Sequence, residues 1–341
     1  MAARKKRKAL ITGVTGQDGS YLAELLLQKG YEVAGIVRKT SHFKHANIEH
    51  IQDRLNLVYA DLIDGVSLST AIEKVMPDEI YNLAAQSSPL ESFKQPIHTV
   101  EITAVGAHRL IEAARDIVPK AKIYQASSSE MYGWVNAIPQ SEKTAPNPAN
   151  PYAAAKLYAH NIASIYRKSY GMFICCGVLY NHESPRRGFG FVTQKVAYAA
   201  ACAKLGIENS QHLNEEGEPV VKNGKVALGN LAAKRDWGYA GDFVEAMWLM
   251  MQQTKPDDYV IATGETRTIR ELCRVAYAYV GKNYKDYIYV DQRFVRPTET
   301  GPLIGDSSKA KKKLGWKPKV SFQELVEMLV DANIARLKNP S

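Results

Sequence analysis

The stretch Lys8-Ala-Leu-Ile-Thr-Gly-Val-Thr-Gly-Gln-Asp-Gly19 joins a short apolar strand to a glycine-rich turn. Apolar residues then recur at helical spacing until Gly30, where a helix would end. A glycine loop in this context lets a pyrophosphate approach the backbone, where the helix N-terminus offers free N–H groups and a positive dipole end. The GxxGxxG spacing alone also occurs in plain turns. The residues expected to bind a dinucleotide here are Gly13, Thr15, Gly16, Gln17, Asp18 and Gly19.

Strands and helices alternate through the first half of the chain. We expect further strands at 32–37, 57–60, 79–84, 122–126 and 173–179, and helices at 105–117 and 152–170. Such alternation predicts an α/β fold, a Rossmann-like sheet of parallel strands that is doubly wound, with helices on both faces.

The composition predicts a cytoplasmic protein. No apolar run reaches the roughly 18–20 residues of a membrane span, and the charged N-terminus leads into a strand too short for a signal peptide. None of the four cysteines forms a CxxC pair, so we expect buried thiols and no metal site. The formal net charge of +9 suits a phosphate-bearing substrate. Five of these charges lie in Arg4–Lys8, but no aromatic residues are interleaved with them, so we expect a solvated terminus rather than a nucleic-acid site.

The end of the second strand indicates which dinucleotide is bound. NAD-binding proteins place an acid there for the ribose 2′-hydroxyl, whereas this chain has Arg38, Lys39, Thr40 and Ser41. Two cations and two hydroxyls favour the 2′-phosphate of NADP; the alternative is a solvated basic loop. Asp61 and Leu62 follow the third strand, and Leu83, Ala84, Ala85, Gln86 and Ser87 follow the fourth, so both segments are expected at the cofactor rim.

A hydroxyl, a carboxylate, a phenol and an amine form the candidate reacting group. Tyr152 and Lys156 are spaced i and i+4, so they share one helix face. An isolated YxxxK is common by chance, but here it opens a helix that follows the fifth strand. The Lys156 ammonium is expected to favour the phenolate of Tyr152, and it could also hold a ribose hydroxyl. Ser128 and Glu130 lie at the carboxyl end of that strand, where ligands bind in this fold.

Several longer motifs resemble the extended short-chain dehydrogenase/reductase family. They are Gly13 to Leu27, Asn82-Leu-Ala-Ala-Gln-Ser87, Gln125-Ala-Ser-Ser-Ser-Glu-Met-Tyr-Gly133, Tyr152 to Lys156, Tyr180-Asn-His-Glu-Ser-Pro-Arg-Arg-Gly188 and Ala233-Lys-Arg-Asp-Trp-Gly238. Within that family the chain is similar to the nucleotide-sugar 4,6-dehydratases, most of all to the GDP-mannose 4,6-dehydratases. The resemblance covers nearly the whole sequence.

This resemblance implies a reaction and a role for each candidate. Tyr152, with Ser128 and Lys156, would take the proton of the sugar O4 hydroxyl while C4 is oxidised by NADP. Glu130 would then remove the acidified C5 proton, and the C6 hydroxyl would leave as water before C6 is reduced. A plain dehydrogenase does not need Glu130, so this residue discriminates between the two reactions.

The resemblance also implies further ligand contacts. His182 and Arg187 would contact the cofactor, together with the loop that holds Arg38 and Lys39. The GDP-sugar substrate would be bound by Ser87, Glu130, Asn181, Lys195, Arg235 and Arg296. Arginine suits a diphosphate because its planar fork makes paired, charge-assisted hydrogen bonds.

The sequence departs from the family pattern at three places. Ser128 stands where a threonine is usual, and His98 replaces a cofactor-contacting tyrosine. The segment 207–225 is longer and more polar than in the family, and Glu215-Glu-Gly-Glu218 predicts an exposed hairpin or loop. It could alter sugar selection or an oligomer contact, although loops also absorb neutral insertions at low cost.

The family pattern implies two interleaved domains and an oligomer. A cofactor domain would span 1–180 plus about 228–262, and a smaller, mostly C-terminal lobe for the nucleotide sugar would span about 181–227 plus 263–338. Helices at 105–117 and 152–168 would form the seam of a homodimer or homotetramer. The alternatives are the same chemistry on a related sugar such as GDP-manno-heptose, a nucleotide-sugar reductase or epimerase, and a binding protein on this fold.

Overall fold

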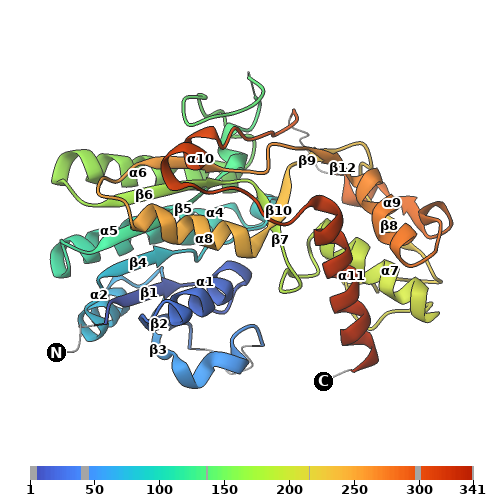
Figure 1. Cartoon of the computed structure of the whole chain (residues 1–341), viewed down its shortest axis with the longest axis horizontal. Coiled ribbons are helices and arrows are strands. Elements are labelled where there is room, and N and C mark those ends of the chain that lie inside the picture. The colour runs from blue at the N-terminus through green and yellow to red at the C-terminus, as the bar shows by residue number, and fades with distance from the viewer. Residues whose placement is uncertain (1–5, 40–45, 136, 215, 296–300, 340–341) are drawn as a thin grey trace.

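A parallel sheet organises the protein (Figure 1). The computed structural model describes residues 6–39, 46–135, 137–214, 216–295 and 301–339, and within them the sheet has seven strands in the order β11-β6-β5-β4-β1-β2-β3. In chain order the strands are β1 (Lys8–Thr12), β2 (Glu32–Val37), β3 (Asn56–Tyr59), β4 (Glu79–Asn82), β5 (Lys122–Ser128), β6 (Ile174–Leu179) and β11 (Asp258–Ile261). The chain reverses its progress between β1 and β4, so the ligand crevice is expected at their carboxyl ends. The predicted doubly wound sheet is confirmed.

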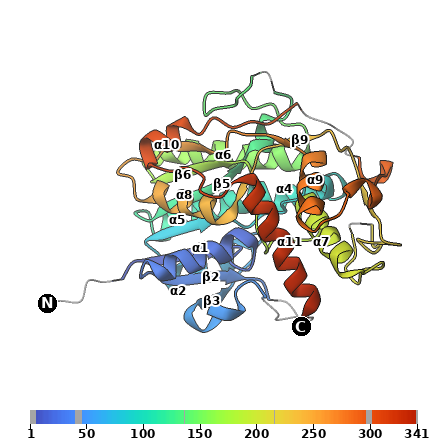
Figure 2. The same cartoon turned by 45° about the vertical axis from the view of Figure 1, so that its right-hand side comes forward.

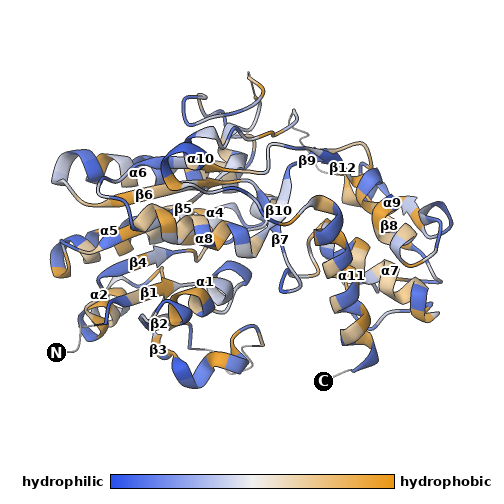
Figure 3. Ribbon diagram, viewed as in Figure 1, coloured by the Kyte–Doolittle hydropathy of each residue, from blue (hydrophilic) through white to orange (hydrophobic). Residues whose placement is uncertain are grey.

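Helices cover both faces of this sheet. Helices α1 (Gln17–Gln28) and α8 (Ala240–Met251) pack against each other on one face, whereas α2 (Gly65–Val75), α5 (Gly106–Ile117) and α6 (Pro151–Tyr170) pack on the other. Apolar residues follow the central strands and α8 in Figure 3. The strands bury side chains on both faces, which explains why their sequences are mostly apolar instead of alternating. None of the described helices is both long and apolar enough to cross a membrane.

The segment between β4 and α5 is built from short helical pieces. It contains α3 (Pro89–Lys94), α4 (Pro96–Val100) and a π-helical turn (Glu101–Val105). Pro89 and Pro96 each occupy the first position of a helix, where a missing N–H costs no hydrogen bond. The helix that we expected to begin at residue 105 therefore continues a longer helical run.

A smaller lobe lies beside the sheet. Figure 2 shows its helices α7 (Val192–Leu205), α9 (Ile269–Tyr279) and α11 (Phe322–Lys338) grouped together, and α11 packs on both other helices. Short strand pairs join the lobe segments: β7 (Asn181–Glu183) with β10 (Trp237–Tyr239), β8 (Val226–Leu228) with β13 (Ile288–Val290), and β9 (Lys234–Arg235) with β12 (Arg267–Thr268). Helix α10 (Ser308–Leu314) and 3-10 turns at Glu49–Arg54, Ser129–Tyr132, Tyr284–Asp286 and Gln292–Phe294 complete the described elements.

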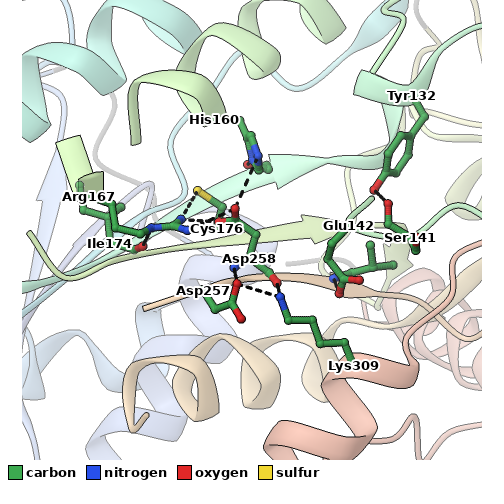
Figure 4. Close-up of polar contacts among 12 residues, drawn as sticks. Tyr132, Ser141, Glu142, His160, Arg167, Ile174, Cys176, Asp257, Asp258 and Lys309 are labelled. Atoms are coloured by element: carbon green, nitrogen blue, oxygen red, sulfur yellow. Dashed lines mark hydrogen bonds and ion pairs between the residues drawn. The ribbon is translucent and has the colours of Figure 1, made fainter. Parts of the chain in front are cut away.

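Charged side chains fix the edge strand β11 to the rest of the sheet (Figure 4). Arg167 of α6 pairs with Asp258 and donates to the Ile174 carbonyl at 2.8 Å. Burial alone would raise the pKa of Asp258, but the Arg167 guanidinium outweighs it and the net shift is downward. Glu142 accepts the Val260 N–H at 2.8 Å, and the Lys309 ammonium donates to the Asp258 carbonyl at 2.7 Å. Backbone groups of an edge strand are thereby covered instead of being left for another chain.

We expect Arg167→Met to lower the free energy of unfolding by about 2–3 kcal/mol, because Asp258 would keep its charge and lose its partner. The value lies at or below the range for fully buried pairs, since the two side chains are 15% and 24% exposed. Urea unfolding is the measurement. Arg267→Met is the matched control, because its pair with Glu265 is exposed and is worth at most about 1 kcal/mol. Equal losses in both variants would contradict a special role for the Arg167 pair.

Candidate active site

The glycine loop joins β1 to α1 at the carboxyl end of the sheet. Gly13 has φ +72°, and a Cβ there would come within 3.0 Å of the Ala84 nitrogen after β4. A Cβ on Gly19 would lie 2.2 Å from the Gly13 carbonyl oxygen. Helix α1 begins at Gln17, and its N-cap residue Gly16 has no side chain that could cap it. The glycines are therefore required by close packing, and the helix N-terminus presents N–H groups that no capping side chain occupies.

A cavity of about 580 Å³ lies at this switch point of the sheet. It gathers most of the predicted cofactor residues, namely Gly13, Thr15, Gly16, Gln17, Asp18, Gly19, Arg38, Asp61, Leu62, Leu83, Ala84, Ala85, Gln86, Ser87 and Arg187. His98, the position of the absent tyrosine, also lines it. Lys39 is exposed and is not part of this lining, and Thr40 and Ser41 lie outside the described residues.

The chemistry of this cavity fits a dinucleotide. Its wall combines backbone N–H groups of a helix start, the cation of Arg38 and apolar residues such as Leu62. Within the described part of the chain, the Gln86 carboxamide oxygen is buried without a hydrogen-bond partner. A buried acceptor without a partner is costly, so a ligand that donates a hydrogen bond there would be favoured.

Tyr152 and Lys156 project from the first turns of α6 toward the end of β5. The Lys156 ammonium donates to the Ala126 carbonyl at 2.9 Å and lies 5.9 Å from the Tyr152 ring centre. Burial lowers the pKa of Lys156 to about 8. Burial also raises the pKa of Tyr152 to about 12, against the lowering effects of a hydrogen bond with Ser128 and of the Arg187 charge. The expectation that Lys156 favours the phenolate is therefore wrong, because the net shift favours the neutral phenol and Lys156 does not contribute to it. The charges of Asp18 and Arg187, two residues that line the first cavity, also act on this phenol.

Glu130 is held in a tight turn next to these groups. The turn Ser129–Tyr132 begins with Ser128, whose hydroxyl accepts the Glu130 N–H at 3.2 Å. The Asn150 amide donates to Glu130 Oε2 at 3.0 Å, while its oxygen accepts the Ala153 N–H at 2.8 Å and caps α6. Sequence reasoning missed Asn150, although an asparagine before a proline at a helix start is a recognisable cap. Asn150 therefore ties the carboxylate to the helix that carries Tyr152.

His182 lies behind the glycine loop and binds protein groups through both ring nitrogens. Nε2 is 2.8 Å from Asp18 Oδ2, and Nδ1 is 2.7 Å from the Tyr180 carbonyl oxygen. Both partners only accept hydrogen bonds, so the ring is held as a cation. Although burial opposes both charges, the pair lowers the pKa of Asp18 to about 2 and raises that of His182. The imidazolium thus neutralises a carboxylate at the start of α1.

A second cavity, of about 180 Å³, lies between α3 and the lobe. Its lining includes the predicted substrate residues Asn181, Lys195 and Arg235, while Arg296 lies outside the described residues. Lys195 and Arg235 are 5% and 8% exposed, which places two cations in a largely buried wall. Ser87 lines the first cavity and Ser88 the second, so the two adjoin along the loop after β4.

Comparisons with known proteins agree over nearly the whole chain. The family model described as GDP-mannose 4,6 dehydratase matches residues 10–329. GDP-mannose 4,6 dehydratase 2 of Arabidopsis thaliana is 50% identical over 98% of this chain and 88% of the relative. GDP-mannose 4,6 dehydratase of Homo sapiens is 44% identical over 99% and 94%. The solved structure of Thermus thermophilus UDP-glucose 4-epimerase in complex with NAD is 28% identical, with a TM-score of 0.81 over 96% of this chain and 98% of that one.

The Asp18–His182 pair predicts a pH-dependent contribution to stability. Asp18 stabilises the fold above its ordinary pKa of 3.8, and this contribution is lost as the pH falls toward 2. His182 contributes fully below its ordinary pKa of 6.5, and its contribution is lost as the pH rises through the raised value. The loss of unfolding free energy in His182→Gln should therefore be largest between about pH 4 and 6.5 and shrink in alkali. Urea unfolding across pH measures it, with the half-exposed His50→Gln as the control; a pH-independent loss would contradict the ion pair.

Proposed function

The chain belongs to the GDP-mannose 4,6-dehydratase family, and we propose that it dehydrates GDP-D-mannose at the site formed by Tyr152 and Glu130. The product is GDP-4-keto-6-deoxy-D-mannose, and water is released. The observation that carries this proposal is the carboxylate of Glu130, which Asn150 holds beside Ser128 and the N-terminus of α6. An oxidation alone would need only the hydroxyl, phenol and amine, whereas an elimination also needs a base for a carbon-bound proton.

The proposed reaction divides the proton transfers between two side chains. A bound nicotinamide cofactor would supply reversible hydride transfer. The sugar is oxidised at C4, loses water across C5 and C6, and then receives the hydride at C6 and a proton at C5, without net redox change. Tyr152 accepts the O4 proton, and the Ser128 hydrogen bond lowers the pKa of its phenol against the effect of burial. Once deprotonated, a buried phenol with a raised pKa is a strong base.

Glu130 is proposed as the base for the C5 proton. The C4 ketone acidifies this proton, so a carboxylate in contact with C5 can remove it and then assist the departure of the C6 hydroxyl. Asn150 fixes the position of Glu130 Oε2 at 3.0 Å, which limits rotation of the carboxylate. A residue held at both its backbone and its side chain is suited to a step that depends on orientation.

We propose NADP as the cofactor. Arg38 lines the cofactor-type cavity directly after β2, and Lys39 follows it, so positive charge lies where NAD-binding proteins use an acid. The similar Thermus thermophilus epimerase is in complex with NAD, which supports a nicotinamide dinucleotide in this fold. The Lys156 ammonium and Arg187 are further proposed contacts, whereas His182 would act indirectly through Asp18.

We propose that the lobe binds the GDP part of the substrate and that the protein is a homodimer or homotetramer. Asn181, Lys195 and Arg235 line the lobe cavity, and Arg296 is proposed to join them. Arg235 sits in β9 and Lys195 in α7, so two lobe elements would converge on the diphosphate. Large apolar side chains are exposed on α4 and α6, including Ile97, Val100, Tyr158, Ile165 and Tyr170, which supports a subunit contact there.

Purified protein mixed with GDP-mannose should produce the ultraviolet absorbance of a 4-keto sugar in alkali without added cofactor. The cofactor released on denaturation should carry a 2′-phosphate. If the absorbance develops with another GDP-sugar, such as GDP-manno-heptose, and not with GDP-mannose, then that sugar is the substrate and GDP-mannose is not. Release of a cofactor without the 2′-phosphate would contradict the role of Arg38 and Lys39.

Glu130→Gln should still oxidise C4 but lose elimination, because the amide cannot accept the C5 proton. Turnover is expected to fall by about 10²- to 10⁴-fold, the usual contribution of a general base. Stopped-flow absorbance should then show reduced nicotinamide accumulating after GDP-mannose is added. Glu73→Gln, on the exposed side of α2, is the control and should retain full turnover. Normal product formation by Glu130→Gln would remove this residue from the mechanism.

A further inference from the structure

The segment 207–225 forms an anchored hairpin between α7 and β8. Leu213 and Pro219 form an antiparallel bridge, and the Asn214 N–H donates to the Glu218 carbonyl at 2.7 Å. The hairpin expected from the sequence is thus present in the described residues. His212 stacks on Phe189 with ring centres 4.2 Å apart, and Val220 and Val221 are buried. The base of the hairpin therefore has one defined position on the lobe.

The tip of this hairpin, which belongs to the lobe, contacts a residue on the opposite wall of the second cavity, the cavity lined by Lys195 and Arg235. Glu216 Oε1 lies 3.6 Å from Nζ of Lys94, the last residue of α3. Lys94 lines the cavity that also contains Lys195 and Arg235. Helix α3 follows strand β4, whereas the hairpin belongs to the lobe, so this ion pair joins the two sides of the cavity.

Lys94 adds positive charge to a site that must attract an anion. The diphosphate carries the negative charge of a nucleotide sugar. The described acids of the cavity wall have partners of their own, since Glu91 accepts from Gln95 and Glu183 accepts from Thr193. Lys94 is half-exposed, and its long side chain can reach more than one partner. Glu216 is 34% exposed, so the pair is weak enough to exchange.

We propose that Lys94 is an affinity-determining residue for the diphosphate and that Glu216 competes with the substrate for it. This inference rests on the proposed function, because it assumes a nucleotide sugar in the cavity. Lys94 pairs with Glu216 before binding and with the diphosphate afterwards, so the hairpin tip weakens substrate binding and is released when the substrate enters. Both states are ion pairs near solvent, so their exchange is sensitive to salt.

A neighbouring carboxylate on the same tip provides a matched control. Glu218 pairs with Arg293 of the lobe at 3.2 Å and does not contact Lys94. Glu218→Gln changes the charge of the hairpin by the same amount as Glu216→Gln, but it leaves the Lys94 partner in place. A general effect of hairpin charge would move the affinity of both variants equally.

The experiment measures the Kd of GDP by calorimetry at low and at physiological ionic strength. Glu216→Gln should bind GDP about two- to fivefold more tightly, the range that corresponds to an exposed ion pair. Lys94→Met should bind about tenfold more weakly, because a charge-assisted bond to phosphate is lost. Glu218→Gln should match the wild type, and the differences should diminish with salt.

The proposal predicts opposite changes in GDP affinity, with tighter binding in Glu216→Gln and weaker binding in Lys94→Met. A purely structural ion pair would weaken binding in both single variants and would be restored by the exchange Lys94→Glu with Glu216→Lys. Under the proposal this exchange does not restore affinity, because the α3 cation is lost. Wild-type protein that binds GDP but does not act on GDP-mannose would contradict the proposed function alone, whereas unshifted Kd values would contradict the role of Lys94.

Discussion

The docking of α6 onto the carboxyl end of β5 is the constraint on which the site depends. Three residues at helical spacing make the contact: Tyr152 through Ser128, Lys156 through the Ala126 carbonyl at 2.9 Å, and His160 through the Ser127 hydroxyl at 2.9 Å. Further along the helix, Arg167 binds the edge strand β11. Because these contacts recur every turn or two, a rotation of α6 would break all of them together. The reacting phenol is therefore positioned by the whole helix.

Burial sets the electrostatics of this interface. It shifts Tyr152 and Lys156 toward their neutral forms, with pKa values of about 12 and 8, so two groups whose ordinary pKa values are similar move apart. At the neighbouring glycine loop the opposite arrangement holds, because Asp18 and His182 remain charged as a pair. Their net charge is zero, so the positive end of α1 is not opposed by a single carboxylate where an anion is expected. The same low-polarity environment thus disfavours the charged forms of Tyr152 and Lys156, whereas the opposite charges of Asp18 and His182 stabilise each other.

Local sequence patterns predicted the sheet because its strands are short, mostly apolar and separated by segments with helical periodicity. They could not place β11, since Asp258–Ile261 joins the sheet after the lobe and only the family resemblance anticipated a returning segment. Asn150 and Glu142 escaped prediction for a similar reason: their partners, Glu130 and Val260, are distant in sequence. The cofactor contact that the resemblance implies for His182 stays a prediction, and the sequence did not indicate that both ring nitrogens contact Asp18 and Tyr180 inside the protein.

The loop between Gly133 and Asn150 contacts both the edge strand β11 and the candidate active site. Trp134 and Asn147 pair across its base, since the Trp134 N–H donates to the Asn147 carbonyl at 3.0 Å. Gly133 makes this closure possible: its φ is +50°, and a Cβ would lie 1.9 Å from that carbonyl oxygen. Glu142 at the far side of the loop accepts the Val260 N–H of β11. Glu130 lies in the turn just before this loop. Gly133 allows the loop to close directly after the turn, and Asn150 at the end of the loop donates a hydrogen bond to the Glu130 carboxylate. The position of the carboxylate therefore depends on the backbone of the loop as well as on its own hydrogen bonds.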